Sequence, residues 1–421
     1  MMIETNVRPP MERPRQAARP AGSLTLGIDV WLLLAVFTLL VFGALMVYSA
    51  SWDFSLFVNE GDPTATFRRQ MMWMVVGIAG AVVASFLDYH WYRRLAVPIM
   101  AATIVGLITV FIIGEVRYNA TRTLSEGSYS PSELAKVAII IYLAVWLFSK
   151  REQLRDISFG LVPLGMIVGF VSGLIYLQPD LSAAATIVLL GGLMFFLAGG
   201  DLKQIFVLSV LVVFVGWFVV QVQPTGSDRI ASYLEGIKDP TQAGYHVRRS
   251  IEAFVNGGLF GVGIGNSGTK YTGLPVPPTD SIFAVVVEET GLIGGTVLVS
   301  LYLVLLWRGL VIARRAPDQL GSLLAAGLTI WIALEAMVNM AVMVGLVPFA
   351  GNALPFISVG GSNLIVTLGA VGIILNVARQ GKAAANEAAP LPRRRQHAPD
   401  DMRRRERRRG VSRPGRSTGA G

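Results

Sequence analysis

The chain has 421 residues, of which 53% are hydrophobic and 15% charged, whereas soluble domains carry about 25% charged residues. This composition excludes an ordinary soluble enzyme, and the recurrence of apolar runs of about 20 residues predicts a polytopic membrane protein. Because the chain has no cysteine and only three scattered histidines, disulfides, thiolate chemistry and a His-based metal motif are excluded as well.

The net charge of +9 belongs to one tail. From Arg379 onward there are 13 basic and 4 acidic residues, so the rest of the chain is balanced. The excess therefore does not indicate a nucleic-acid-binding fold. Two roles of the tail stay open, a solvated segment that fixes topology and a segment that attaches to anionic lipid.

Composition divides the chain into three regions. Residues 1–24 are polar and rich in Pro and Arg, which predicts a disordered cytoplasmic tail. Residues 25–379 form the predicted membrane domain, and residues 380–421 form a disordered, basic cytoplasmic tail. The fold class is all-α, with about ten transmembrane helices at 29–48, 70–87, 95–113, 133–148, 158–176, 182–199, 203–222, 282–307, 319–345 and 357–378.

Lys and Arg in the short loops predict the orientation of these spans. The loops near residues 93–94, 150–155 and 308–315 are basic, so they are expected in the cytoplasm together with both termini. The interval 223–281 is then one large extracytoplasmic loop. Its piece 247–262 is too short and too charged to span, and we expect it to lie on the membrane surface or to re-enter the membrane.

A glycine-rich stretch precedes the eighth span. Residues 263–268 formally match a dinucleotide fingerprint, but that motif needs a preceding strand and a βαβ unit, which membrane flanks exclude. A P-loop is excluded because Thr269 separates Gly268 from Lys270. Two readings remain, a loop whose N–H groups and Lys270 bind a phosphate-bearing ligand, and a plain turn.

Asp280 stands at the mouth of the eighth span. It could be the N-cap of that helix, a position that favours Asp, or a general base at the membrane surface. The two roles can coexist. A helix N-terminus lowers the pKa of a carboxyl group, whereas a bound phosphate nearby raises it.

Other carboxylates lie at or inside the predicted spans. Glu288 and Glu289 are costly in lipid, so at least one should face a cavity or a basic partner inside the bundle. Asp180 follows a proline turn and either caps the next helix or helps to shape a site. Glu133 and Lys136, at spacing i,i+3, predict an intrahelical ion pair.

Several motifs occur together in one order. They are PSELAK at 131–136, QPDL at 178–181, TDSIFAVVVEE at 279–289 and LPFISVGGS at 354–362. This set resembles the SEDS family, polytopic peptidoglycan polymerases of the FtsW/RodA/SpoVE type, over roughly residues 29–379. The loop 261–270 resembles the division members more than the elongation members. The chain departs from the family pattern at His246, Val276 and Pro278, which leaves the fine substrate contacts open.

The resemblance implies a glycosyltransferase that polymerises lipid II during septal cell-wall synthesis and releases undecaprenyl pyrophosphate. The alternatives are an elongation-type polymerase, a lipid II flippase and a non-catalytic scaffold of the division machinery. Asp280 is the expected catalytic base. The expected substrate-binding residues are Lys270, Arg229, Arg248, Glu133, Lys136, Asp180, Ser358 and Ser362.

The resemblance also implies surroundings and partners. The location is a bacterial cell membrane, crossed several times. The partners are lipid II, membrane lipids, a class B penicillin-binding transpeptidase and other division proteins, with no nucleic acid. A divalent cation, Mg²⁺ or Mn²⁺, is the one cofactor left open, and no protein metal site is expected.

Overall fold

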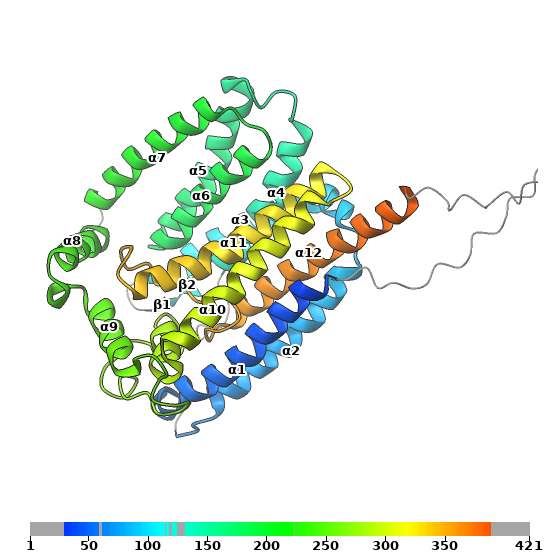
Figure 1. Ribbon diagram of the computed structural model, residues 1–421. Helices are drawn as coiled ribbons and strands as arrows, with labels where there is room; N and C mark the ends of the chain where they lie inside the picture. Colours follow the sequence, from blue (N-terminus) through cyan, green and yellow to red (C-terminus); the bar gives the residue numbers. More distant parts are fainter. Residues whose placement is uncertain are drawn as a thin grey trace, which may run out of the picture.

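The computed structural model describes residues 29–58, 61–113, 115–117, 120–123, 131–222 and 224–388. Ten apolar helices form one bundle (Figure 1), and each overlaps one predicted span. Most of the helix ends lie within a few residues of the predicted ends. The prediction of an all-α polytopic protein is confirmed. The helices are α1 Val30–Val58, α2 Ala65–Phe86, α3 Tyr92–Ile113, α4 Pro131–Ser149, α5 Val162–Tyr176, α6 Leu181–Leu197, α7 Leu202–Val222, α10 Ile282–Arg314, α11 Gln319–Met343 and α12 Gly361–Ala388.

Eight of these ten helices are long and apolar enough to cross a membrane. The other two, α6 and α7, have shorter apolar stretches, at Leu181–Leu197 and Leu202–Trp217. Helices satisfy all interior backbone hydrogen bonds within one segment, which is why apolar sequences of this length take this form in lipid.

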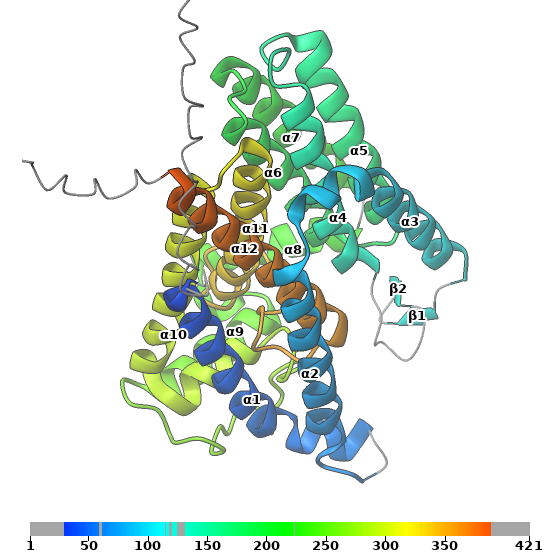
Figure 2. The same cartoon turned by 90° about the vertical axis from the view of Figure 1, so that its right-hand side faces the viewer.

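The predicted large loop is itself helical. It holds α8 (Pro224–Lys238), the one-turn helix η3 (Pro240–Gln242) and α9 (Tyr245–Gly257), which accounts for most of the segment predicted to lie on the surface or re-enter. Figures 1 and 2 place α8 and α9 away from the end of the bundle where the chain termini leave.

Short elements complete the connections. They are η1 (Tyr89–Trp91), the π-helical turn η2 (Ile157–Leu161) and a small antiparallel hairpin of β1 (Glu115–Arg117) and β2 (Ala120–Thr123), which pairs Val116 with Thr121.

The start of α1 and the end of α12 lie at the same end of the bundle (Figures 1 and 2), as an even number of spans requires. That this end is cytoplasmic stays a prediction. Helix α12 continues to Ala388, past the expected end of the membrane domain at residue 379. The predicted N-terminal tail, and the C-terminal tail from residue 389, lie outside the described residues.

Two polar ties hold α1 against α10. Arg308 pairs with Asp29 at one end, and the Ser49 hydroxyl donates to Glu289 Oε1 at 2.6 Å at the other. The ties are 20 residues apart on α1 and 19 on α10, which is about 30 Å of helix. This separation is close to the hydrocarbon thickness of a typical bilayer.

Helix α2 packs closely against α12 through small residues. A Cβ atom at Gly372 would lie 2.4 Å from the Ala81 carbonyl oxygen, and one at Gly361 would lie 2.7 Å from Trp73 Nε1. Such glycines let two membrane helices approach with their backbones nearly in contact.

Helix α10 is broken at Gly291, whose φ of 73° and ψ of −179° are not helical. The break frees backbone groups on both sides, and the segment after α9 satisfies them. Val262 N–H donates to the Glu288 carbonyl at 3.0 Å, Gly263 N–H to the Glu289 carbonyl at 3.1 Å, and Leu292 N–H to the Gly258 carbonyl at 2.9 Å.

Candidate active site

Asp280 lies just before α10, in a turn bound to the segment 350–360 that leads into α12. The Ser358 hydroxyl donates to the Thr279 carbonyl at 2.6 Å, and Val359 N–H donates to the Pro278 carbonyl at 2.8 Å. Asp280 itself is half-buried. The last span therefore starts at Gly361 rather than at the predicted residue 357, because the residues before it are used to hold this turn.

Asn339 on α11 fixes the backbone of Asp280 from a second side. Its Nδ2 donates to the Asp280 carbonyl at 2.9 Å and to the Asn352 carbonyl at 2.5 Å. Asn339 lies 21 residues after Asp318, which precedes α11 at the other end of the bundle, so the two are about 31 Å apart along that helix. Asp280 is thus held about one hydrocarbon thickness from the Asp318 end of the bundle.

The prediction that Asp280 is the N-cap of the eighth span is wrong. Ser281 occupies that position, and its side chain makes no capping hydrogen bond. The reason is the binding of the preceding turn, since the contacts of Thr279 and Asp280 with Ser358 and Asn339 hold these residues outside the helix.

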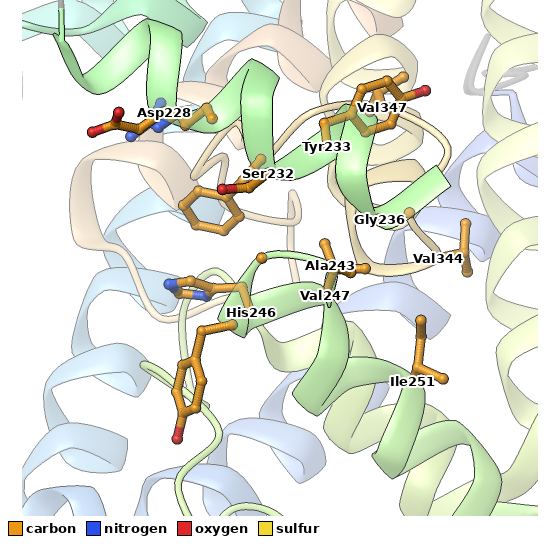
Figure 3. A pocket seen from close by; sticks show the side chains of 15 residues that line it. Asp228, Ser232, Tyr233, Gly236, Ala243, His246, Val247, Ile251, Val344 and Val347 are labelled. Atoms are coloured by element: carbon orange, nitrogen blue, oxygen red, sulfur yellow. The ribbon is translucent and has the colours of Figure 1, made fainter. Parts of the chain in front are cut away.

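A cavity of about 420 Å³ lies between α8, α9 and the segment 344–349. In the close-up of Figure 3, Asp228 and Ser232 project from α8 above His246 of α9. The His246 ring stacks on the Phe349 ring at 4.0 Å between centroids, and the Arg229 guanidinium lies 5.5 Å from the centre of the same Phe349 ring.

Gly351 lies between Asp280 and Phe349 of the cavity wall. A Cβ atom built on Gly351 would lie 3.5 Å from Asp280 Oδ2 and 3.7 Å from Phe349 Cε1. The carboxylate of Asp280 and the ring of Phe349 are therefore within about 7 Å of one another. Arg229, a predicted substrate ligand, also lines the cavity, and its guanidinium lies over the Phe349 ring.

His246 supplies an uncharged ring to the cavity. Burial, and then the positive charge of Arg229, lower the pKa of His246 to about 4, so the ring is neutral at pH 7. Its Nδ1 is buried and has no hydrogen-bond partner among the described residues. A buried ring nitrogen of this kind is suited to a ligand or to a bound water molecule.

Behind the site lies a buried ionic cluster. The predicted pair of Lys136 and Glu133 is confirmed at 2.8 Å, and Lys136 also bonds Glu335 of α11. Asn363 Nδ2 donates to Glu133 Oε2 at 2.9 Å, directly after Ser362 in the first turn of α12. Glu335 is one helical turn from Asn339, so this cluster braces the residue that holds Asp280.

Asp180 caps α6, as one of the two readings predicted. Its Oδ1 accepts from Ala183 N–H at 3.2 Å and from the Ser182 hydroxyl at 3.0 Å. Its other oxygen lies 3.4 Å from the Ser132 hydroxyl, which joins this cap to the start of α4 beside Glu133.

Lys270 does not join Asp280, and its prediction as a phosphate ligand is not supported by its position. Its Nζ pairs with Glu289 at 3.0 Å and also donates to Ser49 Oγ at 3.1 Å and to the Gly265 carbonyl at 2.8 Å. The Lys270 side chain is 4% exposed and that of Glu289 is 0% exposed. These bonds use the donors of the ammonium group, which leaves none for a substrate.

Glu288 holds the glycine-rich loop from the inside. It accepts hydrogen bonds from the hydroxyls of Ser267 and Thr269, and from the backbone N–H groups of Gly268 and Thr269. Of the two readings of this loop, these bonds favour the plain turn, since the N–H groups of Gly268 and Thr269 face this carboxylate. Both buried glutamates have the internal partners that their position predicted.

Arg248 lies on the exposed surface of α9, with its guanidinium 5.7 Å from the ring centre of Tyr245, a residue of the cavity wall. No described contact brings it to Asp280. Ser358 is brought there, and Ser362 lies in the adjoining first turn of α12.

Sequence reasoning missed Glu335, Asn339 and Phe349. Glu335 had a readable signal, because a carboxylate inside a predicted span is costly in lipid and marks a functional or paired position. Asn339 follows at i+4 on the same helix face. Phe349 had no such signal, since an aromatic residue in a loop of a membrane protein is common.

Comparisons with known proteins agree with this geometry. The model of the cell cycle protein family FtsW/RodA/SpoVE matches residues 30–383. The chain is 39% identical over 370 residues to a probable peptidoglycan glycosyltransferase FtsW of Trichlorobacter lovleyi, covering 86% of this chain and 95% of that protein. It is 37% identical over 360 residues to stage V sporulation protein E of Bacillus subtilis, covering 84% and 98%.

Solved structures show the same fold. A chain from the study "Structural coordination of polymerization and crosslinking by a peptidoglycan synthase complex" has a TM-score of 0.68 at 26% identity, covering 85% of this chain and 99% of that chain. The rod shape determining protein RodA of Thermus thermophilus has a TM-score of 0.61 at 26% identity, with 85% and 98% covered. This chain therefore belongs to the FtsW/RodA/SpoVE family.

Proposed function

We propose that this protein is a peptidoglycan glycosyltransferase that polymerises lipid II into glycan strands at the septum, with Asp280 as its catalytic base. Membership in the family and the names of the relatives support the glycosyltransferase activity. The high share of relatives named FtsW among the most similar proteins supports the role in division over that in elongation.

The observation that carries the proposal is the position of Asp280. Its backbone is fixed by Asn339, and the preceding residue by Ser358, while its carboxylate lies within about 7 Å of Phe349 on the cavity wall, at a height that we assign to the edge of the hydrocarbon layer. The sugars of a lipid-linked substrate lie at this height, because the polyprenyl chain stays in the hydrocarbon and the polar head does not.

The reaction follows from this placement. The acceptor 4-hydroxyl oxygen attacks the anomeric carbon of the donor sugar, its proton passes to the Asp280 carboxylate, and the bond to undecaprenyl pyrophosphate breaks. The diphosphate that leaves carries negative charge, which Arg229 on the cavity wall is placed to offset. Lys270 is excluded from this role by its buried ion pair with Glu289.

The cavity beside Asp280 suits a sugar ring. It combines the ring of Phe349, the neutral ring of His246 and the charged groups of Asp228 and Arg229 within a volume of about 420 Å³. Binding sites of this size pair apolar walls with a few placed polar groups that fix orientation.

A divalent cation fits this site as a companion of the substrate. The described residues include no group of three His, Asp or Glu side chains that could enclose a metal ion. Mg²⁺ commonly binds through one or two carboxylates and substrate phosphates, so Asp280 is the protein ligand that the site offers to Mg²⁺ or Mn²⁺. When bound, the ion would offset charge on the diphosphate.

A penicillin-binding transpeptidase is the proposed partner. The related chain of known structure comes from a complex that coordinates polymerization and crosslinking. Crosslinking needs an active site of its own, and the site built around Asp280 in the described residues is suited to sugar transfer.

The flippase alternative would need an open polar path through the bundle. In the described part of the bundle, the buried charges Glu133, Lys136 and Glu335 bond one another and Asn363 rather than lining such a path. We therefore favour polymerisation over transport.

The test is a lipid II polymerisation assay with purified wild-type and Asp280→Asn proteins, each with and without the transpeptidase. Asp280→Asn keeps the shape of the side chain and removes the base. We expect a loss of roughly 10²- to 10⁴-fold in the rate of strand synthesis, with unchanged thermal unfolding. Wild-type rates from well-folded Asp280→Asn protein would refute the assignment, and transpeptidase binding without strands from the wild type would favour the scaffold.

A further inference from the structure

The segment 255–264, which joins the end of α9 to the glycine-rich loop, exposes large apolar side chains. Phe260 is 80% exposed and Val255 is 75% exposed, and Leu259, Val262 and Ile264 are exposed as well. No charged residue occurs between residues 253 and 269. A patch of this kind, on a loop outside the ten spans, marks an interaction surface.

Much of the backbone of the same segment is hydrogen-bonded within the protein. The N–H groups of Gly258, Gly261, Val262 and Gly263 all donate to backbone carbonyls. Its carbonyls are used too, because those of Gly258 and Leu259 accept from Leu292 and Ile293, and that of Val262 accepts from the Asn266 side chain at 3.3 Å. Irregular backbone tolerates lipid only when its polar groups are satisfied in this way.

The depth of the segment is fixed by its bonds to α10. It is hydrogen-bonded alongside residues 288–293, at the level of the tie of Ser49 to Glu289 and about 30 Å of helix from the tie at the opposite end. Leu292 and Ile293 are 57% and 50% exposed and begin the lipid-facing surface of α10, which Val297 continues. The apolar patch of the segment is therefore continuous with a surface that lipid covers.

We infer that the segment 255–264 is inserted in the bilayer, in the leaflet nearest to Asp280, with Leu259 and Phe260 among the acyl chains. The occupant of the patch is lipid, because the patch adjoins the exposed apolar side of α10, lacks charge and has much of its backbone hydrogen-bonded within the protein. The inference rests on the membrane topology and not on the proposed reaction.

The insertion has a consequence for the cavity. The first half of α9 carries His246, Val247 and Ile251, which line the cavity near Asp280. Since α9 is 13 residues long, or about 20 Å, its inserted end sets the height of the cavity wall above the hydrocarbon. The segment thus anchors α9 in the membrane and so positions the α9 wall of the cavity relative to the bilayer.

The experiment uses the natural absence of cysteine. Single-cysteine variants of the full chain are labelled with the fluorophore NBD and placed in phosphatidylcholine nanodiscs. The positions are Phe260→Cys in the segment, Val297→Cys on the lipid-facing side of α10 and Gln242→Cys in the exposed turn between α8 and α9. Quenching by doxyl-labelled lipid and by aqueous iodide is then measured for each.

We expect the label at Phe260 to match the label at Val297, with strong quenching by doxyl lipid and protection from iodide. Iodide quenching equal to that at Gln242 would overturn the inference. Protection from both quenchers would also overturn it, because it would show that protein rather than lipid covers the patch.

A second pair of variants tests whether Phe260 anchors the segment in the bilayer. With the label moved to Leu259→Cys, Phe260→Glu should lose most of the doxyl-lipid quenching, whereas Phe260→Leu should keep it. Equal quenching in the two backgrounds would show that Phe260 does not hold the segment in the membrane.

Discussion

At the scale of single residues, the buried pair of Lys270 and Glu289 decides between two roles of a lysine in a glycine-rich loop. Its charges are shielded from water and bonded to Ser49 and Gly265, so the pair joins the loop to both α1 and α10. A lysine held in this way stabilises the fold, whereas a lysine that binds phosphate would be open to solvent.

This role predicts the outcome of a double-mutant cycle. Lys270→Met alone leaves the Glu289 charge buried and unpaired, which costs roughly 3–5 kcal/mol, and the double variant with Glu289→Met should recover much of that loss. The measurement is thermal unfolding in detergent. If Lys270→Met instead keeps its stability and raises only the KM for lipid II, Lys270 is a substrate ligand after all.

His246 makes the stability of the large loop depend on pH. Its folded pKa of about 4 lies below the ordinary value of 6.5, so the unfolded chain binds the proton more readily. The contribution of the neutral ring is complete above about pH 6.5 and is lost as the pH falls towards 4.

We therefore expect the unfolding temperature of the wild type to fall between pH 6.5 and pH 4, and to fall less in a His246→Gln variant. Unfolding curves across this range, recorded for both proteins in the same buffers, provide the check. Parallel curves for the two proteins would show that His246 does not titrate as its surroundings imply.

At the scale of elements, the break in α10 is the feature that the site depends on. Gly291 has a φ of 73°, and a Cβ atom there would lie 2.2 Å from the Leu259 carbonyl oxygen. Gly261 faces the break from the other side, where a Cβ atom would lie 2.2 Å from the Glu289 carbonyl oxygen. The two glycines let a loop and a broken helix share backbone hydrogen bonds.

Gly291→Ala should separate the loop from α10 and lower the unfolding free energy by more than about 1 kcal/mol, together with a loss of polymerisation. Gly169→Ala in α5 is the matched control, since open space surrounds its Cβ position and the change favours a helix. Thermal unfolding and strand synthesis are measured for both. Equal behaviour of the two variants would count against the importance of the break.

The elements also show what could be predicted from the sequence. The spans were found because apolar runs dominate any local signal, and the Asp180 cap and the Glu133–Lys136 pair were found because their partners are within a few residues. The pairing of Lys270 with Glu289 was missed, since it requires the loop to fold back on a helix. The break at Gly291 was hidden because one glycine in an apolar run does not reveal its φ angle.

At the scale of the whole molecule, contacts between distant segments build the site. Asp280 was predicted from its motif, but its support comes from Asn339, 59 residues away, and from Ser358 beside α12. The cavity wall joins α8 and α9 to a loop more than 90 residues further along the chain. No local pattern carries such information, because each partner is an ordinary polar or aromatic residue by itself.

The two ties between α1 and α10 make the protein sensitive to the thickness of its membrane. Because Asp29–Arg308 and Ser49–Glu289 stand about 30 Å apart, hydrophobic mismatch in a thicker bilayer would draw one tie into the acyl chains. We expect strand synthesis in vesicles of monounsaturated phosphatidylcholines to peak at the acyl length that gives this thickness and to fall on either side. A rate of strand synthesis that does not depend on acyl length would show that the ties do not make the enzyme sensitive to bilayer thickness. A peak would mean that lipid composition alone can sort and regulate this polymerase.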